Sequence, residues 1–246
     1  MHAGWLAMIA LADARRNHLL NALSESILDR WLPDMERVDM SLGAVLYEAA
    51  EKLDYVYFPI NAVVSLLYVM ESGASAEIAV VGNEGIVGIF LLLGDGSTTS
   101  RALVQCGGEG VRIPARDFKR VLNRSALVLH LMMRYTQALI TQMAQTAVCN
   151  RHHSLDQQLC RWLLLSLDRL PGNELIMTQK LIANMLGVRR ERVHEAARKL
   201  QDAGLIHYSR GHISVLNRKQ LERRSCECYV TVKREYDRLL ANLPAR

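Results

Sequence analysis

Neither proline nor glycine occurs between Ala115 and Asn150. An uninterrupted run of this length predicts one long helix, because these two residues are the strongest helix breakers. A seam of side chains along it follows alternating three- and four-residue steps, the spacing at which two helices pack side by side. The seam consists of Met132, Tyr135, Leu139, Gln142, Thr146 and Cys149. It predicts pairing with the same helix of a second copy, and packing inside one protomer is the alternative.

The chain before this helix consists of short apolar segments separated by glycines. Many short strands at this spacing are typical of a β-sandwich or jelly roll. The predicted strands cover residues 44–47, 55–59, 63–70, 76–81, 102–105 and 110–113. Upstream, apolar residues at helical spacing predict one helix over 18–32 that ends at Pro33. Residues 5–12 lack a basic leader, so they predict a helix rather than an export signal.

Charge is divided unevenly along the chain. Residues 1–150 hold 12 Lys/Arg against 15 Asp/Glu, whereas residues 151–246 hold 18 against 10. A basic module joined to a mildly acidic one is typical of a nucleic-acid-binding region attached to a control domain, since attraction to phosphates is mainly electrostatic. Half of the residues are hydrophobic, which excludes a disordered chain. The longest apolar run near the start is too short to span a bilayer, so we expect a cytoplasmic protein without a membrane partner.

Two helices joined by a glycine are predicted in the basic half. The first is opened by Thr178, a capping residue, and ends at Gly187. The second runs over 189–201 and is closed by Gly204; its apolar residues share one face and its long polar side chains the other. This arrangement predicts a helix-turn-helix, whose second helix fits the major groove of DNA.

A β-hairpin is predicted directly after the second helix, because the segments 205–209 and 213–215 flank the turn residues Arg210 and Gly211. Such a hairpin forms a wing, and its side chains would contact phosphates beside the groove. The predicted DNA-binding residues of the two helices and the wing are Arg189, Arg190, Glu191, Arg192, His194, Glu195, Arg198, Thr178, Gln179, Arg210 and His212.

The stretch from Met177 to Ile206 resembles the winged helix-turn-helix of the Crp/Fnr family, the bacterial transcription regulators named for the cyclic-AMP receptor protein and the fumarate and nitrate reduction regulator. The matching residues are Met177-Thr178-Gln179, Ile182-Ala183, Leu186-Gly187-Val188, Arg190-Glu191, Val193 and Leu200 to Ile206. The resemblance extends over nearly the whole chain and implies an α+β fold. Its expected parts are an N-terminal helix and jelly-roll β-sandwich sensor domain over 1–114, a dimerisation helix over 115–150, and a winged helix-turn-helix DNA-binding domain over 151–246.

The resemblance implies a transcription regulator, not an enzyme, that binds double-stranded DNA as a homodimer on a palindromic operator. It also implies RNA polymerase as a partner. Several family members have arginine where this chain has Glu195, and a carboxylate cannot read guanine in the same way, so we expect a different operator sequence. The alternative hypothesis is a ligand-binding regulatory subunit that docks on a partner protein.

The sensor region departs from the family members that bind cyclic nucleotides. Those members bind the phosphate with an Arg-Ser/Thr-Ala sequence, whereas Arg101 stands about three residues beyond the expected position and has no hydroxyl after it. A buried phosphate without a cation is costly, so we predict neither cyclic AMP nor another cofactor, while haem stays open. The candidate pocket residues for an unidentified small effector are Glu84, Gly85, Gly88, Thr98, Ser100 and Arg101.

The five cysteines contain no run of four for an iron–sulfur cluster and no paired C-x-x-C motifs for zinc, so no metal site is predicted. Cys226 and Cys228 form one close pair, which is compatible with a shared metal, a redox pair or two small buried side chains. A third hypothesis, a metal-dependent enzyme, finds no carboxylate at ligand spacing. Its candidate ligands are His152, His153, His207 and His212. Residues 150–154 are the predicted hinge between the two domains.

Overall fold

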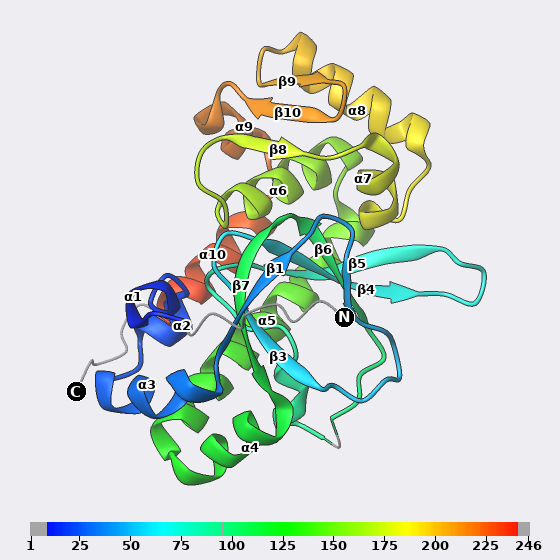
Figure 1. Cartoon of the computed structure of the whole chain (residues 1–246). Helices are drawn as coiled ribbons and strands as arrows, with labels where there is room; N and C mark the ends of the chain where they lie inside the picture. Colours follow the sequence, from blue (N-terminus) through cyan, green and yellow to red (C-terminus); the bar gives the residue numbers. More distant parts are fainter. Residues whose placement is uncertain (1–8, 95, 241–246) are drawn as a thin grey trace, which may run out of the picture.

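The computed structural model describes residues 9–94 and 96–240 (Figure 1). An N-terminal β domain with short helices is followed by a long helix and then by a mainly helical C-terminal domain with a small sheet. This order confirms the predicted α+β class. The helix predicted over 5–12 lies largely outside the described residues. None of the helices in the described part is long and apolar enough to cross a membrane.

Seven strands of the N-terminal domain form two antiparallel sheets, with the orders β1-β7-β3 and β2-β6-β4-β5. The strands are β1 Glu36–Met40, β2 Val45–Tyr47, β3 Tyr55–Pro59, β4 Val63–Val69, β5 Ser75–Val81, β6 Arg101–Cys106 and β7 Gly108–Pro114. They bury side chains such as Phe58, Leu66 and Val104 almost completely, so the sheets enclose the core of this domain. Each predicted strand is present, with ends shifted by at most two residues.

Strand β1 was not predicted, because three of its five side chains, those of Glu36, Arg37 and Asp39, are charged. Two of them form cross-strand ion pairs with β7, Glu36 with Arg112 and Arg37 with Glu109, each at 2.6 Å. β1 lies at the edge of its sheet. Opposite charges on facing strands stabilise an exposed edge while hiding the apolar alternation that identifies a strand from sequence.

The predicted helix over 18–32 is wrong as a single element. The chain instead forms three short pieces over this range, α2 His18–Asn21, α3 Glu25–Trp31 and the 3-10 helix η1 Leu32–Asp34, and the short helix α1 Leu11–Ala14 precedes them. The break falls at Ser24, which takes an extended backbone. Asn17, the N-cap residue of α2, fixes this helix to the β domain, because its buried amide donates to the carbonyls of Pro59 and Gly85, both at 2.9 Å.

The run over 115–150 is also divided, into α4 Ala115–Arg124 and α5 Ala126–His152. Ser125 separates them: its backbone is extended, and its Oγ accepts a hydrogen bond from the amide of Val128 at 3.4 Å. A serine cap satisfies an amide that the first turn leaves free, so a new helix can start without proline or glycine. The prediction of one continuous helix is therefore wrong at this residue.

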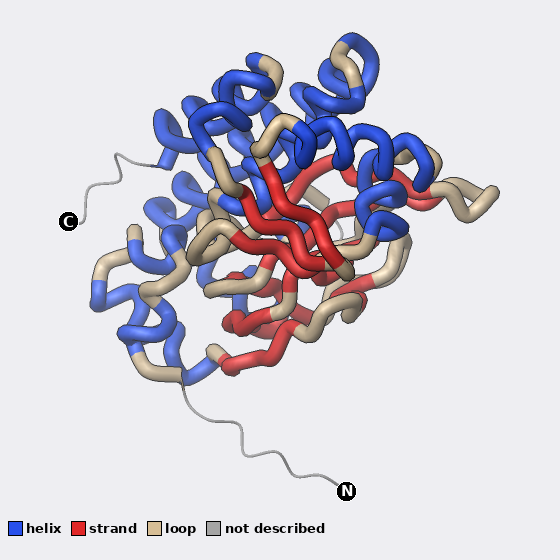
Figure 2. Tube along the Cα trace, turned by 90° about the horizontal axis from the view of Figure 1, so that it is seen from above, coloured by secondary structure: helices blue, strands red, loops and turns tan. Residues whose placement is uncertain are grey.

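The C-terminal domain holds a three-stranded sheet with the order β8-β10-β9, next to its helices (Figure 2). Its elements are α6 Leu155–Leu167, β8 Glu174–Ile176, α7 Gln179–Leu186, α8 Arg190–Asp202, β9 Ile206–Ser209, β10 His212–Val215, α9 Arg218–Arg224 and α10 Glu227–Leu240. One short 3-10 helix, η2 Ile89–Leu92, belongs to the N-terminal domain. Helix α10 leaves the C-terminal domain and packs along α5.

The predicted seam of α5 faces the protein's own interior. Met132, Tyr135, Leu139, Gln142 and Thr146 are all buried within one protomer, so they cannot form the surface that meets a second copy. Helix α10 and strand β5 pack against α5, and the Tyr135 ring meets Tyr236 of α10 edge to face at 6.3 Å between ring centres. The sequence prediction of these five residues as the dimer interface is therefore wrong, and the alternative of packing inside the protomer is correct.

A second stripe with the same three- and four-residue spacing lies on the exposed face of α5. Its members are His130, Met133, Gln137, Ile140, Ala144 and Ala147. Met133 and Ile140 are 54% and 57% exposed, which is unusual for large apolar side chains at helical spacing. Gln137 of this stripe lies 3.4 Å from Glu235 of α10, whereas the apolar side chains of Met133 and Ile140 remain largely uncovered by the described residues.

Candidate nucleic-acid interface and its contact with the β domain

Helices α7 and α8 form the predicted helix-turn-helix, and local interactions fix its turns. Thr178 caps α7, accepting a hydrogen bond at Oγ1 from the amide of Leu181 at 3.3 Å. Gly187 ends α7 with a positive φ of 64°, a conformation that glycine adopts without steric cost. Two residues later Arg189 occupies the N-cap position of α8. The sequence prediction of both helices is confirmed, with ends that differ by about one residue.

One face of α8 is buried and the other carries a ridge of polar side chains. Val193, Ala196, Ala197 and Leu200 are buried against the rest of the domain. The ridge consists of exposed residues that were predicted from the sequence: Arg189, Arg190, Glu191, Arg192, His194, Glu195 and Arg198. Nothing in the described part of the chain covers this ridge, so it is free to meet a ligand.

The charged side chains of the ridge differ in whether they form ion pairs. Glu195 pairs with Lys199 at 3.0 Å, and Arg198 approaches Asp202 at 3.5 Å, both within α8. Among the described residues, no ion pair involves Arg189, Arg190 or Arg192. Three guanidinium groups near the start of α8 are therefore available for hydrogen bonds to phosphates or base edges.

The wing forms as predicted, with the turn at Arg210 and Gly211. Both residues have positive φ, 48° and 85°, which is the geometry of a two-residue hairpin turn. The hydroxyl of Tyr208 donates to the carbonyl of Met177 at 2.8 Å and joins the wing to the start of α7. His212 starts β10 and is exposed.

The start of α7, the start of α8 and the wing line a common groove. It brings together five predicted residues, and three others complete it: Thr178, Gln179, Arg190, His194 and Arg210, with Lys180, Tyr208 and Gly211. Gln179 Nε2 and His194 Nδ1 lie 3.1 Å apart across it. The fold thus gathers residues from three separate elements onto one basic surface.

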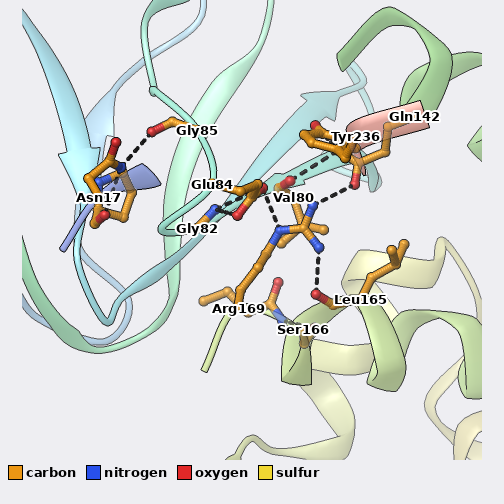
Figure 3. Close-up of polar contacts among 12 residues, drawn as sticks. Asn17, Val80, Gly82, Glu84, Gly85, Gln142, Leu165, Ser166, Arg169 and Tyr236 are labelled. Carbon is orange, nitrogen blue, oxygen red and sulfur yellow. Dashed lines mark hydrogen bonds and ion pairs between the residues drawn. The ribbon is translucent and has the colours of Figure 1, made fainter. Parts of the chain in front are cut away.

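The C-terminal domain is joined to the β domain by a buried ion pair (Figure 3). Arg169 lies just after α6, and its Nε donates to Oε1 of Glu84 at 2.7 Å. The Glu84 carboxylate also accepts from the amide of Gly82, at 3.1 Å to Oε2. A Cβ at Gly82 would lie 2.6 Å from Cβ of Arg169, so the absence of a side chain there lets the arginine pass. We call this the Glu84–Arg169 contact.

Gln142 of α5 extends the Glu84–Arg169 contact to two further elements. Its Nε2 donates to the carbonyl of Val80 in β5 at 3.0 Å and lies 3.4 Å from the hydroxyl of Tyr236 in α10. Its Oε1 is 3.5 Å from Nη2 of Arg169, which stacks over the Tyr236 ring (Figure 3). Gln142, a polar member of the predicted seam, therefore connects both domains and α10 inside one protomer.

A second polar contact between the domains runs from the sheet of β4, β5 and β6 to α6. Ser65 Oγ lies 2.5 Å from Oε2 of Glu77 and 2.7 Å from Oε1 of Gln105, and Gln105 Nε2 donates to Ser166 Oγ of α6 at 2.7 Å. All four side chains are buried. A hydroxyl has one hydrogen and cannot donate to both acceptors. A protonated Glu77 resolves this by donating to Ser65, which then donates to Gln105.

Burial raises the pKa of Glu77 to about 7, and the hydrogen bond with Ser65 and the charges of Arg161 and Arg169 offset only part of this effect. A neutral form near neutral pH agrees with the hydrogen-bond count. We call the series from Glu77 to Ser166 the Glu77–Ser166 contact.

A third contact touches the helix-turn-helix itself. The β4–β5 hairpin reaches α7, where Ser75 Oγ lies 3.5 Å from the carbonyl oxygen of Asn184 (Figure 1). A Cβ at Gly187 would lie 3.4 Å from Cβ of Ala76. The start of β5 therefore lies against the turn between α7 and α8.

Of the six residues predicted for an effector pocket, one lines the cavity beside Arg169. Glu84 lines a cavity of about 220 Å³ with Arg169 and Tyr236, and none of the other five candidates lines it. Arg101 donates to Glu48 at 2.7 Å instead, and Thr98 Oγ1 and Ser100 Oγ lie 3.0 Å apart. Gly85 packs under the Tyr135 ring, and Gly88 has a φ of 95°. The two charged candidates, Glu84 and Arg101, thus already have partners of opposite charge.

The predicted hinge coincides with a break between helices, because α5 ends at His152 and α6 begins at Leu155. Ser154 caps α6 in a reciprocal pair with Gln157.

The fold also places Cys149 and His153 beside Cys226 and Cys228. Because Cys149 and His153 lie far from Cys226 and Cys228 in the sequence, they were not grouped from the sequence, and no metal site was predicted. Of the four histidines of the enzyme hypothesis, only His153 belongs to a metal-compatible group among the described residues.

Two family models match this chain. The model of the Crp-like helix-turn-helix domain matches residues 157–224, and that of the cyclic nucleotide-binding domain matches residues 37–125. Together they cover more than half of the chain and coincide with the groove-bearing domain and the β domain. The chain belongs to the Crp/Fnr family. It is thus a Crp/Fnr-type transcription regulator with a helix-turn-helix DNA-binding domain.

Solved structures share the fold of this Crp/Fnr protein. A protein from Eubacterium rectale assigned to the Crp/Fnr family superposes with a TM-score of 0.66 at 19% identity, covering 84% of this chain and 96% of that one. FixK2 from Bradyrhizobium japonicum gives 0.65 at 16% identity, with 78% and 98% covered. The c-di-GMP-responsive regulator CLP of Xanthomonas campestris gives 0.61 at 16% identity, with 78% and 99% covered. No curated protein matches the chain.

Proposed function

We propose that this regulator binds a palindromic DNA operator as a homodimer and reads its sequence with α8. The observation that carries the proposal is the exposed ridge of α8, where Arg189, Arg190 and Arg192 form no ion pair with other described residues. Arginine near the start of a recognition helix can donate two hydrogen bonds to guanine in the major groove. The groove beside the wing adds Arg210 as a phosphate contact. RNA polymerase as a partner stays a prediction of the family resemblance.

The exposed stripe of α5 supports the homodimer. Met133 and Ile140 leave apolar surface in water, and a second copy of the same stripe would bury both at the spacing of two packed helices. A twofold axis along α5 would then present two copies of α8 to one duplex, as a palindromic operator requires.

We propose further that a small effector controls the regulator through the Glu84–Arg169 contact. The contact lines the cavity of about 220 Å³, and Arg169 stands directly after α6, the first helix of the DNA-binding domain. A ligand that bound only one arrangement of this contact would shift the position of α8.

Replacing Arg190 tests base reading. Arg190→Ala should weaken binding to the specific operator by about 1–3 kcal/mol and relax base preference at one position, because a bidentate base contact is lost. The matched control is Arg223→Ala, which removes an exposed charge from α9 outside the groove. Gel-shift titrations on operator and on random DNA measure both; equal loss on the two DNAs would contradict base reading by Arg190.

Replacing Ile140 tests the dimer. Ile140→Glu should convert the dimer to a monomer and reduce operator affinity, since it places a charge in the apolar stripe. Ile176→Glu is the control, because Ile176 is similarly exposed, at 58%, but lies on β8. Sedimentation velocity measures the mass. An unchanged mass in Ile140→Glu would exclude the stripe as the interface.

Salt titration of binding tests the alternative function. Operator binding that does not weaken with added salt would favour docking on a partner protein over binding to DNA.

A further inference from the structure

Four potential metal ligands converge at the junction of α5, α6 and α10. Cys149 lies in the last turn of α5, and His153 follows the end of that helix. Cys226 directly precedes α10, and Cys228 lies in its first turn. One ligand atom from each residue can be chosen so that all four lie within 4.8 Å of one another. Two chain segments more than seventy residues apart therefore meet through their sulfur and imidazole groups.

Two of the separations between these ligand atoms match those of a tetrahedral site. Zn–S bonds of about 2.3 Å and Zn–N bonds of about 2.0–2.1 Å place two sulfurs about 3.8 Å apart and a sulfur and a nitrogen about 3.5 Å apart. Cys149 Sγ lies 3.5 Å from Cys226 Sγ, and Cys228 Sγ lies 3.6 Å from His153 Nδ1. A disulfide needs about 2.05 Å between its sulfurs, so Cys149 and Cys226 are not bonded to each other.

The three cysteines are buried but do not join the hydrophobic core. They form a separate small cluster, whereas Cys106 and Cys160 are part of the main core. Packing as small apolar side chains does not require three cysteine sulfurs to converge on one point beside an imidazole nitrogen. The grouping therefore distinguishes these cysteines from the two that fill ordinary core positions.

The surroundings supply the supports that metal ligands need. With Nδ1 directed at Cys228, the other nitrogen of His153, Nε2, lies 3.3 Å from the carboxylate of Glu227. A carboxylate on the second ring nitrogen orients a metal-bound histidine. Gln158 Nε2 donates to the carbonyl of His153 at 2.9 Å and lies 3.4 Å from that of Cys149, which fixes the chain around both ligands.

A nearby charge also suits a thiolate-rich site. Three thiolates around a divalent ion leave one net negative charge, which a buried site must balance. The guanidinium of Arg161 is buried within electrostatic range of Cys149 and Cys228. Its Nη2 donates to Thr146 at 2.5 Å, while its Nε has no hydrogen-bond partner in the described part of the chain.

We propose that Cys149, His153, Cys226 and Cys228 bind one structural Zn²⁺ ion. Thiolate and imidazole ligands in a tetrahedral arrangement select zinc over oxygen-preferring ions, and four protein ligands leave no position for a substrate. The ion fastens the start of α10 to the end of α5, across the break before α6. It thereby holds Tyr236 of α10 against Arg169 and stabilises the position of the DNA-binding domain. None of the four ligands belongs to the residues proposed to contact the operator or to line the effector cavity.

The test is the metal content of the full-length protein purified under reducing conditions. We expect about one zinc per chain by mass spectrometry of the metal. Cys226→Ser and Cys228→Ser should lose it, whereas Cys106→Ser, which changes a core cysteine outside the cluster, should keep it. His153→Cys should also keep the ion, because cysteine supplies a fourth thiolate. Zinc retained equally in all variants would overturn the proposal.

A second measurement does not depend on the folding of variants. Wild-type protein stripped with a chelator and titrated with Co²⁺ should develop the visible bands of tetrahedral cobalt bound by thiolates, with an endpoint of one ion per chain. Added Zn²⁺ should remove these bands and raise the Tm of the stripped protein. Absence of the bands would overturn the proposal. So would a protein purified without added reductant or oxidant that contains no metal and in which peptide mapping finds a Cys149–Cys226 disulfide.

Discussion

The two polar contacts between the β domain and the DNA-binding domain differ in how they manage a buried carboxylate. Glu84 faces a guanidinium at 2.7 Å, so it is charged and paired. Glu77 meets a serine hydroxyl at 2.5 Å, and its pKa is raised to about 7 by burial. The first contact therefore depends on charge and the second on a proton. One interface thus combines a buried ion pair with a hydrogen-bonded carboxyl group whose pKa is raised to about 7.

Breaking the charged contact should have the largest effect. Arg169→Met keeps much of the aliphatic stem over Gly82 but leaves Glu84 buried without its cation, which should destabilise the protein by about 3–5 kcal/mol. Urea unfolding monitored by circular dichroism measures this. Arg101→Met removes a half-exposed partner of Glu48 and should cost about 1 kcal/mol or less. Equal losses in the two variants would show that burial does not distinguish these pairs.

Replacing Glu77 should have the next largest effect on the free energy of unfolding, and the size of this effect should depend on pH. Because the pKa of Glu77 is raised in the folded state, the folded protein holds a proton that the unfolded chain has released between about pH 4.5 and 7. Its contribution is therefore most favourable below about pH 4.5, declines as the pH rises to about 7, and then stays constant. A shift of this size corresponds to about 3 kcal/mol.

Glu77→Gln should remove this decline, since an amide can donate to Ser65 at every pH. Unfolding free energies measured from pH 4.5 to 8 should fall for the wild type and stay closer to constant for the variant. Glu84→Gln is the comparison, because it changes the other buried carboxylate of the interface and leaves Glu77 in place. Parallel pH profiles of wild type and Glu77→Gln would contradict a proton-dependent contact.

The smallest effect should come from the last link of the neutral contact. Ser166→Ala removes the acceptor for Gln105 and leaves a buried amide unsatisfied, which should cost about 1–2 kcal/mol. Ser166 also donates to a carbonyl four residues earlier, and exposed Thr231 makes the same kind of bond to Glu227. Thr231→Ala should therefore change stability by less than about 0.5 kcal/mol. Thermal unfolding separates the two, and equal shifts would show that Ser166 acts only within α6.

The helix-turn-helix and wing could be predicted from the sequence because neighbours in the chain determine them. Thr178 caps α7, Gly187 ends it, and Arg210-Gly211 forms the turn of the wing through interactions a few residues long. Binary patterning then decides which face of α8 is buried. The predicted DNA-binding residues followed from these local rules, and the structure leaves all of those on α8 exposed.

The tertiary structure decided the features for which periodicity alone is ambiguous. Two stripes on α5 share one spacing, and only the packing of α10 and β5 shows that the Tyr135 stripe is buried and the Ile140 stripe exposed. Distant contacts also create the Glu84–Arg169 pair and the group of Cys149, His153, Cys226 and Cys228. Sequence determines what each segment can form, whereas partners far away in the chain determine which side it buries, because burial is a property of the whole fold.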